Sequence, residues 1–120
     1  MADLGAVYGP IYLAHGVDGQ KVPVTLVDIT NYRTLEAGVA TPTLELSKDG
    51  GAYASPSDGT WTEVSDGDYT VTLNATDTNT LGGLILRAVK ATVSAESRVY
   101  CIVATSPAEQ RANYIRNRQL

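Results

Sequence analysis

Short apolar runs, separated by clusters of Gly, Asp, Asn, Ser and Pro, recur along the chain from about residue 10 to residue 104. Their spacing of roughly ten residues is typical of a β-sandwich or barrel. The runs are rich in Thr and Val, whose branched side chains pack well on a pleated surface. From Tyr69 to Leu73 the apolar residues occupy every second position, so Tyr69, Val71 and Leu73 are expected to face inward.

The runs predict about seven strands in an all-β fold. Eight segments are the candidates for these strands: 11–14, 21–29, 41–48, a short one around 52–54, 61–64, 69–73, 84–89 and 99–103. An Asp-Gly-Gly segment at 49–51 and an Asp-Gly pair at 66–67 supply the positive-φ residues of tight hairpins. The polar stretch 76–80 is expected to form a helical turn that crosses between the two sheets.

Two strands carry more specific expectations. In the run 41–48, Leu44 and Leu46 are expected to point one way, and Thr43, Glu45 and Ser47 the other. Pro23 lies within 21–29 and favours an edge or strand-start position, because proline cannot donate a ladder hydrogen bond.

The last two strands, 84–89 and 99–103, are apolar at both odd and even positions. A strand that is apolar on both faces is usually covered on both. One cover is the sandwich core, and we expect the other to be a neighbouring protein chain.

After residue 105 the pattern changes to helical spacing. Ser106 to Glu109 reads as a capping box with proline at the first helical position, and a helix is expected from about 107 to 118. A helix this short is marginal alone in water, so it needs a surface to dock on. We therefore expect it to anchor the chain to other proteins, with these residues at the interface: Arg111, Tyr114, Ile115 and Arg118. Two alternatives are that the helix packs on its own sandwich and that the arginines contact nucleic acid.

Charge is distributed unevenly along the chain. The formal net charge is −4, and residues 106–120 hold three arginines against one glutamate, which gives +2 there and leaves −6 for residues 1–105. An acidic body argues against nucleic acid and against an anionic membrane as partners. The basic helix instead fits an acidic surface, either on an identical subunit or on another protein. We divide the chain into a lead at 1–9, a sandwich at 10–105 and the helix at 106–120.

Candidate chemistry is sparse, and we predict no catalytic, cofactor-binding or metal-binding residues. The single histidine, His15, lies at a Gly-flanked turn and is expected to be solvated or to bond within that turn. The single cysteine, Cys101, lies in an apolar run and is expected to be a buried hydrophobic residue. Calcium between Asp-containing loops is the alternative for these residues: Asp58, Asp66, Asp68, Asp77 and Asn79. The N-terminus lacks the features of a signal peptide and no run is long enough to cross a membrane, so we expect synthesis in the cytoplasm.

Three segments resemble a module of tailed-bacteriophage virion proteins. They are Leu44–Tyr53, Trp61–Leu73, and Ala75–Leu81 running into Leu84–Ala88. Over residues 24–90 the chain looks like the immunoglobulin-like module of phage tail, baseplate, fibre and capsid-decorating proteins. The resemblance implies an immunoglobulin-like antiparallel β-sandwich without catalytic residues. It also implies a place in the virion, after assembly in the bacterial cytoplasm, with other virion proteins and copies of the chain itself as partners.

Two other function classes are alternatives. A module that binds a host surface carbohydrate is suggested by Trp61 and the seven tyrosines, since aromatic side chains form platforms for sugars. An enzyme is the weaker alternative, because few acids, bases and nucleophiles lie near a recognisable motif.

Overall fold

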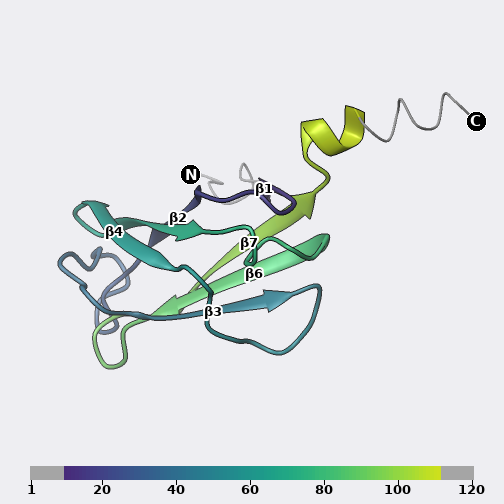
Figure 1. Cartoon of the computed structure of the whole chain (residues 1–120). Coiled ribbons are helices and arrows are strands. Elements are labelled where there is room, and N and C mark those ends of the chain that lie inside the picture. Colours follow the sequence, from purple (N-terminus) through teal and green to yellow (C-terminus); the bar gives the residue numbers. More distant parts are fainter. Residues whose placement is uncertain (1–9, 112–120) are drawn as a thin grey trace, which may run out of the picture.

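The computed structural model describes residues 10–111, which form a two-layer β-sandwich followed by the beginning of a helix (Figure 1). The seven strands are β1 (Ile11–Ala14), β2 (Gln20–Thr25), β3 (Thr43–Lys48), β4 (Thr60–Ser65), β5 (Asp68–Leu73), β6 (Gly82–Val89) and β7 (Ser97–Ala104). A four-stranded sheet has the order β1-β7-β6-β3, and a three-stranded sheet has the order β2-β5-β4. The predicted all-β sandwich is therefore confirmed.

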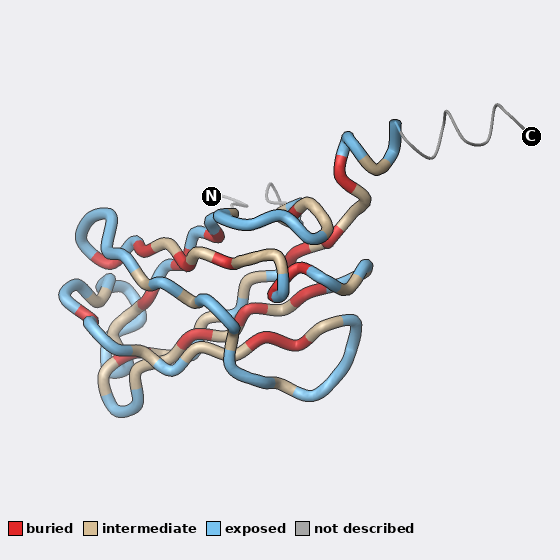
Figure 2. The backbone as a smooth tube through the Cα atoms, viewed as in Figure 1, coloured by how far each residue is buried: buried red, intermediate tan, exposed pale blue. Residues whose placement is uncertain are grey.

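The core lies between the two sheets and is built by alternation along the strands (Figure 2). On β5 the side chains of Tyr69, Val71 and Leu73 are buried, as predicted. On β6 the buried positions are Leu84, Leu86 and Ala88, which face the core from the opposite sheet. Burial of each large apolar side chain favours folding by roughly 1.5–3 kcal/mol.

Both predicted Asp-Gly turns adopt the required backbone conformation. Asp66 and Gly67 have φ of 39° and 98° and join β4 to β5, whereas Asp49 and Gly50 have φ of 48° and 80°. The strand predicted around 52–54 is wrong, since only Ala54 forms a bridge, with Leu46. The chain continues from there to β4 in the other sheet, so it leaves the edge of β3 after one bridge.

Ser47 departs from the expected alternation, because it is buried although its neighbour Leu46 is buried too. Its hydroxyl donates a hydrogen bond of 2.7 Å to the carbonyl oxygen of Gly51. The turn after β3 therefore covers a position that the pattern alone assigns to the surface.

Strand pairing is antiparallel except at β1, which runs parallel to β7. The expectation of an antiparallel sandwich did not include this pair. The turn after β1 leads to β2 in the other sheet, so β1 has no hairpin partner and lies beside the last strand instead. Pro23 lies on β2, an edge strand of the three-stranded sheet, as predicted.

The connection from β5 to β6 crosses between the sheets through a single helical turn, as predicted. The amide of Thr78 donates to the carbonyl oxygen of Asn74 over 3.2 Å. Within residues 10–111, no helix is long and apolar enough to cross a membrane.

Candidate functional site

The outer face of the four-stranded sheet is the strongest candidate for a functional surface. It carries Tyr12, Ile85, Tyr100 and Ile102, which we call the tyrosine face. The two tyrosines are 68% and 58% exposed, although they lie on the outer surface of ordered strands rather than on loops. Single exposed apolar side chains are common, but a contiguous patch of them marks a surface of interaction. The apolar character predicted for both sides of β6 and β7 is thus present on the outer side.

Pairing places these side chains in two adjacent rows across the sheet. Tyr12 lies beside Ile102, and Ile102 lies beside Gly83. Tyr100 lies beside Ile85, and Ile85 lies beside Ser47. In both rows an aromatic side chain stands toward β1 and a small residue stands toward β3.

Charged groups on this face are neutralised within the chain. Arg87 forms an ion pair with Glu45, and its guanidinium lies 3.8 Å from the centre of the Tyr53 ring. The hydrogen bond to Glu45 raises the pKa of Arg87. At the start of β7, Arg98 forms an ion pair with Glu96. Two positive charges are therefore balanced by two negative ones.

The outer face of the three-stranded sheet has a different character. Its outward positions are dominated by five threonines, which we call the threonine face: Thr25, Thr60, Thr62, Thr70 and Thr72. Hydroxyl groups are well hydrated, and this face has the chemistry of an ordinary solvated sheet.

A groove borders the tyrosine face at the edge where β1 and β7 of one sheet lie near β2 of the other. It has a volume of about 740 Å³. Its lining comes from β1, β2 and β7 and the residue before β1: Pro10, Ile11, Pro23, Thr25, Arg98, Val99 and Tyr100. Tyr100 belongs to both the groove and the tyrosine face, and Thr25 belongs to both the groove and the threonine face, so the groove joins the edges of the two faces.

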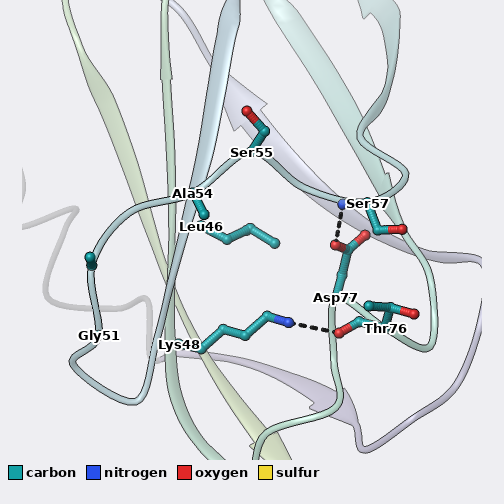
Figure 3. A pocket seen from close by; sticks show the side chains of 9 residues that line it. Leu46, Lys48, Gly51, Ala54, Ser55, Ser57, Thr76 and Asp77 are labelled. Atoms are coloured by element: carbon teal, nitrogen blue, oxygen red, sulfur yellow. Dashed lines mark hydrogen bonds between the residues drawn. The ribbon is translucent and has the colours of Figure 1, made fainter.

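A second hollow, of about 340 Å³, lies between β3, the loop after it and the β5–β6 turn (Figure 3). The carboxylate of Asp77 accepts hydrogen bonds from the amides of Ser57 at 2.6 Å, Asp58 at 3.1 Å and Asn74 at 3.1 Å. The ammonium of Lys48 donates to the carbonyl oxygen of Thr76 over 2.7 Å. Both charged groups are thus bonded within the fold, and they tie the loop to the crossover.

Three of the four aspartates considered for calcium accept hydrogen bonds within the fold. Asp77 holds three backbone amides, Asp58 accepts from the Thr60 hydroxyl over 2.6 Å, and Asp68 accepts from Thr25 over 2.9 Å. In the part of the chain that the structure describes, no three Asp, Glu, His or Cys residues gather as metal ligands would.

Contrary to the prediction, His15 does not bond within its own turn but connects the sandwich to the helix and to the β5–β6 connection. Its Nδ1 lies 3.0 Å from a Glu109 carboxylate oxygen, and its Nε2 lies 3.2 Å from the carbonyl oxygen of Asn79. Both partners are acceptors, so both contacts together require the doubly protonated imidazolium. The hydrogen bond to Glu109 is the main cause of a raised pKa for His15.

The helix begins as expected, with residues 107–111 helical. The amide of Ser106 donates to Glu109 over 3.0 Å, and the amide of Glu109 donates to the Ser106 hydroxyl over 3.2 Å, which is the predicted capping box. Arg111 is exposed at the end of this turn. Tyr114, Ile115 and Arg118 lie outside the described residues, so their interface role stays a prediction.

Cys101 and Trp61 are structural. Cys101 is buried, as predicted, and burial raises the pKa of its thiol to about 11. Trp61 stacks on Tyr69 with ring centres 4.4 Å apart, and its indole nitrogen donates to the carbonyl oxygen of Val39 over 2.8 Å. Trp61 is therefore engaged in packing rather than free to form a platform for a ligand.

Sequence reasoning placed the functional residues mainly on the helix and did not single out Tyr12 and Tyr100. The signal in the sequence was that β7 is apolar on both sides. This pattern alone does not show which side faces outward, because that depends on the order of the strands. Compared with models of protein families, with characterised proteins and with solved structures, the chain matches none of them.

Proposed function

We propose that this domain is a non-enzymatic structural component of a bacteriophage particle, fixed there by protein–protein contacts through the tyrosine face. The observation that carries the proposal is an outward sheet face with two exposed tyrosines, two isoleucines and internally balanced charges. The resemblance of residues 24–90 to phage immunoglobulin-like modules supports the virion context. The partners under this proposal are capsid, tail or baseplate proteins and copies of the chain itself.

The chemistry of the face suits a protein partner. Tyrosine and arginine are enriched at the centres of protein interfaces, where each aromatic ring contributes a large contact area. Arg87 and Glu45 are already paired, so covering them does not leave an isolated charge without water. The helix is a second proposed contact, with Arg111 exposed at its first turn.

The direct test is whether the chain stays on particles when the face is altered. Cells carrying the gene would produce particles with the wild-type chain, with Tyr100→Lys, or with Thr70→Lys as a matched change on the threonine face. We expect wild-type and Thr70→Lys chains to co-purify with particles and Tyr100→Lys to be lost. Absence of the wild-type chain from particles, or equal retention of all three, would contradict the proposal.

A surface module that binds host carbohydrate is the second candidate. The observation that favours it is the exposure of the Tyr12 and Tyr100 rings, which offer the platform that Trp61 does not. A glycan array with the wild-type protein and Tyr12→Ala separates the two. Binding that is lost in the variant supports this candidate, and the absence of any bound glycan counts against it.

A further inference from the structure

We infer that the tyrosine face binds the tyrosine face of a second copy of this chain, in a two-fold symmetric contact. The inference rests on the proposed function of this face as an assembly surface and names its partner. Two features of the described residues support it, namely the shape of one cross-strand row and the charge of the face, and the area of the face sets the expected strength of the contact.

The shape of the face is complementary to itself. Along one row, Tyr12 projects on one side of Ile102 and Gly83 leaves a gap on the other. Gly83 is exposed, and a Cβ atom placed there would meet no heavy atom within 4 Å. Each neighbour is one strand away from Ile102, at about 4.8 Å. A projecting ring and a hole thus lie at equal distances from a central side chain.

A two-fold axis that runs along β7 in the plane of contact uses this arrangement twice. Rotation about that axis brings Ile102 against Ile102 and Tyr100 against Tyr100 of the second copy, and it places Tyr12 of each copy over Gly83 of the other. Such a contact is closed, because the same patch is used on both subunits. It ends as a dimer and does not extend into a filament.

Charge favours this face over the rest of the surface for contact between copies. Residues 1–105 carry a formal charge of −6, so two copies repel one another on most approaches. On the tyrosine face the pairs Arg87–Glu45 and Arg98–Glu96 sum to zero. Two copies can meet there without bringing net negative charge together.

The area of the face limits the strength of the contact. The strands range from four residues in β1 to eight in β6 and β7, so at about 16 Å² of sheet per residue the face spans roughly 400 Å². Two such faces bury about 800 Å², which is below the total of about 1,000 Å² that stable specific interfaces exceed and fits a weak association. A contact of this size predicts a dimer of modest affinity that is strengthened by repetition on a particle.

The test is the mass of the full chain in solution, measured by sedimentation equilibrium over a concentration series. We expect a concentration-dependent dimer for the wild type. Gly83→Leu fills the hole and Tyr12→Ala removes the ring, and each should weaken the dimer by tenfold or more, as judged from the order of a single interface contact. The double variant Tyr12→Ala/Gly83→Leu moves the projecting side chain to the opposite side of the row. Its loss of dimer affinity should therefore be smaller than the sum of the losses in the two single variants. Thr70→Lys on the threonine face should leave the dimer unchanged.

Several results would overturn the inference. A monomeric wild type at all concentrations would do so, as would a dimer that neither Tyr12→Ala nor Gly83→Leu weakens. Circular dichroism and thermal unfolding of each variant show whether the sandwich is intact, and Thr70→Lys provides the folded control. A monomer whose retention on particles still depends on Tyr100 would refute self-pairing while leaving the proposed function standing. A dimer that is absent from particles would refute the proposed function instead.

Discussion

The two sheets of this sandwich share one core but present different chemistry outward. Hydroxyl-bearing side chains on β2, β4 and β5 dominate the threonine face, whereas the tyrosine face places aromatic and aliphatic side chains on β1, β6 and β7. Both faces arise from the same alternation along strands, with every second residue buried in the core. Folding constrains the inward residues of both sheets equally, so it does not explain why the outward residues differ.

The difference therefore points to function. An exposed tyrosine or isoleucine on a strand costs little in folding, but it favours contact with another surface over contact with water. The same domain keeps Trp61 and Tyr69 inside, stacked on one another. Aromatic residues that build the fold are thus distinct from those that remain available outside it.

The largest effect is expected where the two sheets are connected. Asp77→Ala removes the acceptor of one backbone amide in the crossover from β5 to β6 and of two in the loop before β4. Each amide left unsatisfied costs about 1–3 kcal/mol where it is buried, so we expect a loss of about 3 kcal/mol or more in the free energy of unfolding. Urea unfolding followed by Trp61 fluorescence measures it.

Asp77→Asn serves as the control for that change. Its single carbonyl oxygen retains part of the acceptor capacity, so the loss in unfolding free energy should be smaller than for alanine. If both variants unfold at the same urea concentration as the wild type, the hydrogen bonds of Asp77 do not stabilise the connection between the two sheets.

A smaller effect separates a buried tyrosine from an exposed one. The Tyr69 hydroxyl donates to the carbonyl oxygen of Glu36 over 2.6 Å and accepts from the amide of Val39 over 3.1 Å. Tyr69→Phe removes both bonds and should lower the free energy of unfolding by about 1–2 kcal/mol. Tyr100→Phe on the tyrosine face should change it by less than about 0.5 kcal/mol. Equal losses in thermal or urea unfolding would show that the exposed ring is part of the folding core.

Converting one face into the other should barely change stability. Tyr12→Thr combined with Tyr100→Thr gives the four-stranded sheet the outward chemistry of the three-stranded one. We expect the free energy of unfolding of the monomer to stay within about 1 kcal/mol of wild type, since each is a surface change. Association between copies should be lost in sedimentation experiments. A large loss of stability would mean that the tyrosines serve the fold rather than a partner.

Local pattern sufficed to predict the sandwich, because its determinants are local. The alternation of Tyr69, Val71 and Leu73 fixes which side of β5 is buried, and the positive-φ pairs at 49–50 and 66–67 fix the turns. The capping box at Ser106 and Glu109 could be predicted for the same reason, because it depends on residues three positions apart.

Features that depend on distant pairing were not predictable in this way. The parallel partner of β1 is decided by the path of the chain between sheets, and no local pattern encodes it. The single bridge at Ala54 and the burial of Ser47 depend on where a loop returns. Tyr100 and Ile102 could be placed on one side of β7, but only the strand order shows that this side faces outward. For Tyr114, Ile115 and Arg118 the sequence prediction stands as made.

The smallest effect is expected from the contact between His15 and Glu109, which lies at the end of the sandwich and belongs to neither face. The hydrogen bond to Glu109 raises the pKa of His15, whereas the Ser106 amide and then His15 lower the pKa of Glu109. The contribution of His15 is complete below its unfolded pKa near 6.5 and is lost as pH rises through its folded value. The contribution of Glu109 is complete above its unfolded pKa near 4.5 and is lost as pH falls through its folded value. The contact should therefore stabilise the start of the helix most between these two values.

A nuclear magnetic resonance titration of the single histidine measures this directly. We expect the pKa of His15 to lie above its ordinary value in the wild type and to fall in Glu109→Gln, since the neutral amide no longer favours the imidazolium. Self-association should not follow this titration, because the tyrosine face contains neither group. A dimer that dissociates with the His15 titration would show that the helix, and not the outer sheet face alone, holds the copies together.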